Sequence, residues 1–489
     1  MKLRARRTWM AGSGCRLGLV LLSVLLATTR ATAEQAEAGT QAQRSLEGGF
    51  RIQQEGPSRA KLVAPGAKYV RAHFSRTPLP AGTNLLVKDA SGRDWQRFDS
   101  PLLAAWSYST PYFNGDTVLL ELAGGPEGPP AEIATLLQGV RLETNGETSL
   151  ARVAGAHQVA GVVIGADDRV HSTDAATGRI LPMNCTGWLV AAGVGLAAGH
   201  CFVPLPSNPQ VLEFNVPPSL PDGTIQHPPP GDQFPIDNSS VKARYDDWNQ
   251  APGSDWAVFR LEDSPSGPVF SAGRPFFRLA TAISPTAPGP GMPLLMVTGY
   301  GGVVLPPGSR GRYNAKSQTE QESLGRLLNT VRADADHETL VHDADTEPGS
   351  SGSPVHLPGT RIAVGIHGSG GANNICRPDP VCNVATGFVN AGLLAAISLV
   401  AGPPGATAAL VDARAPSWAW PADGTGIRPY RSIEDALAAA TSAQVLNIVS
   451  GHYAGQGLTV GPRGRSVTLR AVAGEVVLGP VPRPLGPAP

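Results

Sequence analysis

Charge is scarce in this sequence of 489 residues, and the charge that is present balances. Lysine and arginine together number 39, as do aspartate and glutamate, so the net charge is zero when the histidines are neutral. A chain without an excess of positive charge has no electrostatic footprint for nucleic acid or for an acidic membrane surface. We therefore expect no nucleic-acid partner.

Long apolar runs are lacking beyond the N-terminus. The first residues are basic, an apolar stretch follows over Leu17–Ala27, and Ala31–Ala33 then gives a small-x-small cleavage signal. This order predicts a secretory signal peptide over residues 1–33. The apolar run is too short for a membrane anchor, the competing interpretation. The sequence thus predicts a secreted protein of bacterial type, extracellular or periplasmic, with no integral membrane segment.

Cysteine is rare, and one of the five cysteines, Cys15, lies in the predicted signal peptide. The remaining four suggest two disulfides in an exported chain. They allow three connectivities, of which the local pairs Cys185 with Cys201 and Cys376 with Cys382 are the simplest. The sequence also lacks a His-Glu-x-x-His motif, and its other histidines are scattered, so we expect no metal.

Glycine and proline, by contrast, are abundant, with 58 and 46 residues. Together with the low charge, they favour a loop-rich all-β architecture over helical bundles. The length allows two or three domains with buried cores. Residues 34–150 begin as a polar leader and continue as short strands between turns. They predict a small β-sandwich, an accessory domain or pro-domain for which a surface or a polymer is a candidate ligand.

Three segments carry the prediction of this sandwich. Every second residue of 70–74 is apolar, the pattern of a half-buried strand that leaves His73 on the surface. Leu85–Val87 predicts a second strand, and Asp89–Gly92 has the composition of the hairpin turn that follows it. Asp116–Leu122 predicts another strand.

Residues 151–400 alternate short apolar runs with proline- and glycine-rich loops, which suits two antiparallel β-barrels. We expect Val203–Ser240 to form surface loops and a short helix to follow Asn390. Residues 401–489 read as a Pro/Gly linker and a partial β-helix-like tail, with a capping box at Ser432–Asp435 that opens a short helix. Because a β-helix needs several stacked coils to bury its core, we expect only a short C-terminal appendage.

Two of the three segments that carry chemistry supply a histidine and an aspartate. Asn184–Phe202 predicts a strand, a turn and a second strand that delivers His200, and a disulfide between its two cysteines would hold this general base in place. Asp255 directly precedes an apolar strand, where a buried carboxylate would orient the imidazole. Asp246 and Asp247 are competitors, but they lie in a polar loop.

The third segment, Asp345–Val355, supplies the nucleophile. Ser351 lies in Gly-Ser-Ser-Gly-Ser-Pro, where Gly349 and Gly352 permit a tight turn. The amides of Gly349 and Ser351 would then point at one spot and form an oxyanion hole. The order His, Asp, Ser differs from that of subtilisin-like enzymes and of α/β-hydrolases, and Ser353 breaks the Gly-x-Ser-x-Gly elbow of the latter.

With Val163–Val170 and Ala363–Gly371, the segments that carry His200 and Ser351 resemble the bacterial glutamyl endopeptidase branch of the trypsin-like serine proteases. The resemblance implies a chymotrypsin-like double β-barrel. It also implies a catalytic triad of His200, Asp255 and Ser351 that works without a cofactor.

The same resemblance bears on specificity and activation. In that branch an acidic substrate side chain is bound by a Ser or Thr five residues before the nucleophile and by a later histidine, positions held here by Thr346 and His367. Asp345 stands where trypsin-like enzymes carry the aspartate that binds Lys or Arg, so both preferences stay open. Ser350 replaces the aspartate that pairs with the new N-terminus of many zymogens. We expect processing near Ala151–Val163.

The sequence therefore predicts a secreted serine endopeptidase that hydrolyses protein or peptide substrates through an acyl-enzyme. The alternative is a protease-fold binding protein with little or no activity, attached through its β-sandwich. A carbohydrate-active protein built on the tail is not supported, because the tail has too few coils and no paired carboxylates.

Overall fold

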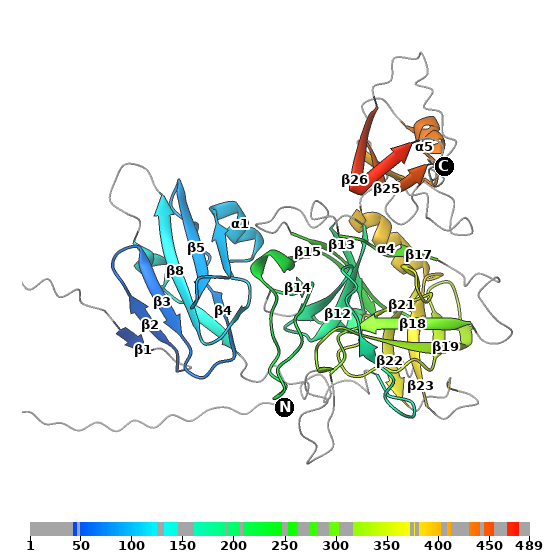
Figure 1. Ribbon diagram of the computed structural model, residues 1–489, viewed down its shortest axis with the longest axis horizontal. Coiled ribbons are helices and arrows are strands. Elements are labelled where there is room, and N and C mark those ends of the chain that lie inside the picture. Colours follow the sequence, from blue (N-terminus) through cyan, green and yellow to red (C-terminus); the bar gives the residue numbers. More distant parts are fainter. Residues whose placement is uncertain are drawn as a thin grey trace, which may run out of the picture. The chain divides into compact units, whose positions relative to one another are not determined.

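The structure is a computed structural model built mostly of β-strands (Figure 1). The predicted all-β fold class is confirmed. None of its described helices is long and apolar enough to cross a bilayer. The predicted signal peptide lies outside the described residues, which are 43–45, 49–124, 132–144, 161–191, 193–205, 209–246, 253–262, 274–280, 293–302, 316–371, 376, 381–401, 408–411, 430–440, 445–453 and 467–478.

The described residues between 43 and 144 form two antiparallel sheets, called the sandwich below. One has the strand order β1-β2-β3-β8-β5-β6 and the other β7-β4-β9. Apolar side chains of both sheets, such as Leu62 and Val70, belong to one buried core. The elements are β1 (Gln43–Ser45), β2 (Arg51–Gln54), β3 (Arg59–Val63), β4 (Tyr69–His73), β5 (Thr83–Asp89), β6 (Trp95–Phe98), α1 (Ser100–Ala105), β7 (Phe113–Asn114), β8 (Thr117–Gly124), α2 (Ile133–Leu136) and β9 (Arg141–Thr144).

The predicted half-buried pattern is wrong for β4, because all five of its residues are buried. Arg71 is fully buried and His73 is 8% exposed, so His73 is not a surface residue. Both side chains can be buried because Glu143 lies on the neighbouring strand β9. Its Oε2 is 2.9 Å from His73 Nε2 and 3.6 Å from Arg71 Nη1. Polar groups can be buried where such partners satisfy them.

Six strands then close into the first barrel, in the order β11-β12-β13-β16-β15-β14. The prediction of surface loops over Val203–Ser240 is wrong where β14 and the first part of β15 lie. Strand β14 pairs with β11 and β15, and β15 pairs with β16, so both belong to the barrel. With only three residues in a proline-rich segment, β14 is too short to show the alternation of apolar and polar residues that marks a strand. The elements are β11 (Thr177–Leu181), β12 (Cys185–Ala191), β13 (Val194–Ala197), η1 (Gly199–Cys201), β14 (Val211–Glu213), η2 (Pro230–Asp232), β15 (Gln233–Tyr245) and β16 (Asp255–Leu261).

The second barrel comprises β18 to β23. Its strands follow the order β19-β18-β21-β22-β23-β20, and β19 also pairs with β20, which closes the ring. Strand β10 (Val170–His171) pairs with β19, and β17 (Arg278–Leu279) pairs with β22. The barrel strands are β18 (Leu294–Gly299), β19 (Gln321–Arg332), β20 (Glu338–His342), β21 (Pro354–His356), β22 (Ile362–Gly371) and β23 (Cys382–Gly387).

Helix α4 (Ala391–Ala401) follows the second barrel, as the sequence predicts. Asn390 caps it, since its Oδ1 accepts a hydrogen bond of 2.8 Å from the amide of Leu393. Leu393 belongs to an apolar cluster that also contains Trp188 of the first barrel and Ile366 of the second. The two barrels and α4 are therefore joined by one buried core.

The C-terminal residues form a three-stranded parallel sheet of β24 (Ala408–Val411), β25 (Val445–Tyr453) and β26 (Thr468–Leu478). Helix α5 (Ile433–Ala439) begins at the predicted capping residue Ser432, whose Oγ accepts from the amide of Asp435 at 3.0 Å. Strand β24 was not expected from the sequence. One coil with its helix buries a small core of its own.

Candidate active site

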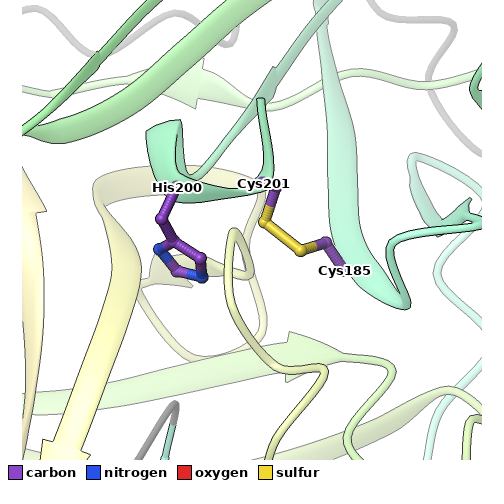
Figure 2. A group of neighbouring side chains, drawn as sticks. All are labelled: Cys185, His200 and Cys201. Atoms are coloured by element: carbon purple, nitrogen blue, oxygen red, sulfur yellow. A yellow bond between two sulfur atoms is a disulfide. The ribbon is translucent and has the colours of Figure 1, made fainter. Parts of the chain in front are cut away.

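His200 lies in the short helical turn η1 directly after strand β13. A disulfide joins Cys185, the first residue of β12, to Cys201 beside this histidine (Figure 2). The structure also contains the second local pair, between Cys376 and Cys382. The first disulfide ties the turn that carries His200 to the neighbouring strand, which limits how far the imidazole can move.

Asp255 is the first residue of β16 and is fully buried. Its Oδ2 lies 2.7 Å from His200 Nδ1, and its Oδ1 accepts from the amide of His200 at 2.9 Å. The amide of Asp255 in turn donates to Thr386 Oγ1 on β23 at 3.0 Å. Burial lowers the pKa of His200, but the attraction and hydrogen bond of the Asp255 carboxylate outweigh it, so this pKa is raised above 6.5.

The two competing aspartates are not found at His200. Asp246 Oδ2 pairs with Arg244 at 2.7 Å and with His337 at 3.1 Å, and it is partly exposed. Asp247 lies outside the described residues. Asp255 is therefore the carboxylate that the structure brings to the histidine.

The loop of Ser351 lies against the segment that leads into His200. Gly352 has φ of +93°, and a Cβ there would be 2.1 Å from the carbonyl oxygen of Thr186 and 2.9 Å from the amide nitrogen of Ala198. The amide of Thr186 donates to the carbonyl of Ser351 at 2.8 Å. Ser351 is 1% exposed, and its hydroxyl has no hydrogen-bond partner in the described part of the chain.

The predicted oxyanion amides belong to the same loop. Gly349 has φ of +106°, a conformation that favours glycine, and its carbonyl accepts from Thr186 Oγ1 at 2.9 Å. The amides of Ser350 and Gly352 each donate to a backbone carbonyl, whereas those of Gly349 and Ser351 donate to no acceptor within the described ranges. Two such amides on one turn can stabilise a developing oxyanion.

Thr346, predicted to line the substrate pocket, is fully buried. Its hydroxyl donates to Asn383 Oδ1 at 2.8 Å and accepts from the amide of Val162 at 3.2 Å. Asn383 also donates from Nδ2 to the carbonyl of Val162 at 2.8 Å. Sequence reasoning missed Asn383, whose only signal is an amide side chain within the apolar strand β23. The Thr346 hydroxyl is thus hydrogen-bonded to the segment of Val162.

His367, the other predicted pocket residue, is fully buried on β22, and its amide donates to the carbonyl of Ser353 at 2.8 Å. The ring of His342, at the end of β20, meets it edge-on, with the ring centroids 5.5 Å apart. Burial, and then the charge of His367, lower the pKa of His342 well below 6.5. His342 is therefore neutral. Sequence reasoning missed it, because nothing local distinguishes a histidine that ends a strand.

Asp345, which the sequence left as a candidate for binding a basic substrate, is engaged elsewhere. Its Oδ1 accepts from the amide of Ile164 at 2.7 Å and its Oδ2 from that of Asp168 at 2.9 Å. Burial raises the pKa of Asp345, and these two hydrogen bonds oppose the shift only in part. The carboxylate thus anchors the segment that enters the barrels.

One group of residues has the spacing of metal ligands. In the described part of the chain, Cys185, His200 and Cys201 offer ligand atoms within 4.8 Å of one another. The two sulfur atoms are bonded to each other, however (Figure 2). Because metal binding by cysteine requires a thiolate, this group does not fit a metal ion while the disulfide is intact.

No protein-family model and no curated protein matches this chain. Among solved structures, a Glu endopeptidase in complex with MPD is 17% identical to this chain. The match covers 49% of this chain and 98% of the endopeptidase, with a TM-score of 0.35. An inactivated protease paralogue of the scabies mite is 16% identical over 44% of this chain and 91% of its own, with a TM-score of 0.31. The mouse-brain serine protease neuropsin is 16% identical over 46% of this chain and 95% of its own, with a TM-score of 0.32. At such low identities and TM-scores, these similarities carry no argument about activity.

Proposed function

We propose that this chain is a secreted serine endopeptidase that cleaves protein or peptide substrates through an acyl-enzyme. Ser351 attacks the scissile carbonyl, and His200 takes the proton of its hydroxyl and later gives it to the leaving amine. Asp255 orients the imidazole, and the amides of Gly349 and Ser351 stabilise the oxyanion. The observation that carries the proposal is the buried contact of 2.7 Å between His200 Nδ1 and Asp255 Oδ2.

This contact decides which nitrogen of His200 can act as the base. In the neutral imidazole, the proton on Nδ1 donates to the Asp255 carboxylate, so Nε2 carries the lone pair. The hydroxyl of Ser351, which has no partner in the described part of the chain, lies on the loop that contacts the segment before His200. A binding protein without activity would have no need for this combination.

Labelling with a fluorophosphonate probe tests the proposal, because the probe reacts only with an activated serine. We expect the secreted protein to label and Ser351→Ala to abolish the signal. Ser353→Ala is the matched control, since Ser353 lies on the same loop, is fully buried and also has a hydroxyl without a described partner. A folded, processed protein that does not label would favour the alternative of a non-catalytic binding protein.

We further propose a preference for glutamate or aspartate before the scissile bond. The imidazole of His367 can bind a carboxylate, and the hydroxyl of Thr346 can do so once it releases Asn383 Oδ1. The competing acid, Asp345, already accepts two backbone amides, which offset part of its negative charge. Profiling on a mixed peptide library should favour acidic residues, and His367→Leu should remove that preference. A preference for Lys or Arg would instead assign the pocket to Asp345.

Activation by cleavage near Ala151–Val163 is part of the proposal. The amide nitrogen of Val162 lies 3.0 Å from Asn383 Oδ1 and close to Thr346, so a cut just before it would place a new ammonium group beside the pocket. N-terminal sequencing of the active secreted form should locate the cut. An active form that begins at Glu34 would contradict a propeptide role for residues 34–150.

A further inference from the structure

The oxyanion glycine is backed by a side chain that the mechanism does not use. A Cβ on Gly349 would lie 2.5 Å from Nε2 of Gln318, so this amide is packed directly against the glycine. Gln318 is 3% exposed and has φ of +56°, the left-handed region that non-glycine residues rarely adopt. Its Nε2 donates to the carbonyl of Tyr300 at 2.8 Å. The placement of Gln318 therefore limits where Gly349 can lie.

A buried ion pair holds Gln318 in this conformation. Arg179 on β11 donates from Nη1 to the carbonyl of Gln318 at 2.9 Å. Its Nε and Nη2 donate to Glu213 Oε2 on β14 at 3.1 and 2.7 Å, and both side chains are fully buried. Buried charges are tolerated only where their hydrogen-bonding groups are satisfied. The position of Gln318 thus depends on how Glu213 holds the guanidinium.

The second oxygen of Glu213 leads to a histidine. Its Oε1 lies 2.8 Å from Nδ1 of His227, a fully buried side chain. Burial lowers the pKa of His227 despite the attraction of Glu213, so the ring is neutral and donates from Nδ1. The ring of Tyr112 stacks on it at 4.7 Å and 6°, and Tyr69 meets it edge-on at 4.6 Å. Both tyrosines belong to the sandwich.

Two reciprocal hydrogen-bond pairs fix this contact. Asn114 donates from Nδ2 to the carbonyl of His227 and accepts from its amide, both at 2.9 Å. Gln233 accepts from the amide of Tyr112 at 2.8 Å and donates from Nε2 to its carbonyl at 2.9 Å. Leu181 of the first barrel also belongs to the apolar core of the sandwich. These contacts hold the stacked tyrosine in one place, as reciprocal pairs do between strands.

We propose that the sandwich is an activating domain that sets the position of the oxyanion hole through a buried series of positioning residues. The series runs from the sandwich to the nucleophile loop through Tyr112, His227, Glu213, Arg179 and Gln318. The sandwich accordingly stays docked after the processing cleavage. This inference rests on the proposed peptidase activity.

Steady-state kinetics of the full processed protein test the sandwich end of the series. Tyr112→Ala removes the stacked ring, and we expect kcat to fall about tenfold, less than the ~10²-fold cost of losing one oxyanion donor outright. KM should change little, because the substrate pocket is untouched. Tyr112→Phe keeps the ring and both backbone hydrogen bonds, but it loses the hydroxyl contact of 2.7 Å to Glu143. It should lower thermal stability while kcat is retained. A fall in kcat of folded Tyr112→Ala is then not explained by lost stability alone, as it would be if the role of Tyr112 were purely structural.

A double-mutant cycle tests whether the effect reaches the oxyanion loop through Gln318. We expect Gln318→Ala to lower kcat, and Tyr112→Ala to add little in that background, because residues of one series are not additive. If Tyr112→Ala fails to fold, Asn114→Ala takes its place in the experiment. It is a smaller change at the same contact and should also lower kcat. Arg59→Ala is the control, since it breaks an exposed ion pair on β3 and should leave kcat unchanged.

Size-exclusion chromatography after processing should show the sandwich fragment eluting with the barrels. Suppose that the wild-type protein labels with the fluorophosphonate probe. Unchanged kcat in Tyr112→Ala and Asn114→Ala, or full additivity of Tyr112→Ala with Gln318→Ala, would then overturn the inference and leave the peptidase proposal standing. A folded wild-type protein that does not label would instead overturn the peptidase proposal, and the inference with it.

Discussion

Asp255→Asn tests the triad most directly, because it keeps the shape of the side chain and removes its charge. The asparagine Oδ1 can still accept from the amide of His200, which now donates to Asp255 at 2.9 Å. Its Nδ2 would then face Nδ1 of His200 across the present 2.7 Å contact. Since Nδ2 is a donor, Nδ1 must become the acceptor and the proton must move to Nε2. A histidine with its proton on Nε2 cannot take the proton of Ser351.

The expected loss of kcat/KM is about 10⁴-fold, equivalent to about 5.5 kcal/mol of transition-state stabilisation. The pH dependence should change as well. In the proposed mechanism the base is neutral His200, whose pKa the Asp255 carboxylate raises above 6.5. Wild-type activity should therefore be lost as the pH falls through that raised value. Without the carboxylate this pKa falls, and the acidic limb of the profile should move to lower pH.

The assay is kcat/KM as a function of pH for the wild type and the variant. Asp246→Asn is the control, because Asp246 forms partly exposed ion pairs with Arg244 and His337 and should leave the profile in place. Thermal unfolding confirms that both variants are folded. A loss of less than tenfold in Asp255→Asn, with the acidic limb unmoved, would refute the role given to Asp255.

Two further predictions concern stability. Burial raises the pKa of Glu320 to about 7 from 4.5, so the stability it contributes is complete below pH 4.5 and is lost as the pH rises through 7. Glu320→Gln should remove this pH dependence and be more stable than the wild type by up to about 3 kcal/mol at alkaline pH. The same curve of unfolding free energy against pH for the wild type and the variant would contradict this. Replacing Cys185 and Cys201 by Ala opens a loop with a sequence separation of 16 and should cost about 3 kcal/mol in denaturant unfolding and lower kcat. Replacing Cys376 and Cys382, separated by 6, should cost about 2 kcal/mol with a smaller effect on kcat, and equal losses of kcat would argue against a special role of the first bridge.

The sequence by itself determined the fold class and indicated the parts of the proposed site that depend on local chain geometry. The glycines at 349 and 352 are needed for a tight turn with positive φ, so they mark the loop of Ser351 without knowledge of its neighbours. The cysteine beside His200 and the strand after Asp255 are equally local signals. The single coil of the tail and its capped helix follow from short-range patterns in the same way.

The tertiary structure alone decided which distant residues meet. Arg179 and Gln318 are 139 positions apart, and Asn383 lies 221 positions from Val162. Strand β14, with three residues, gains its strand character from pairing with β11 and β15. The burial of His73 likewise depends on Glu143, 70 positions away. A buried polar group is satisfied by whichever partner the fold brings to it, and no local pattern encodes that partner.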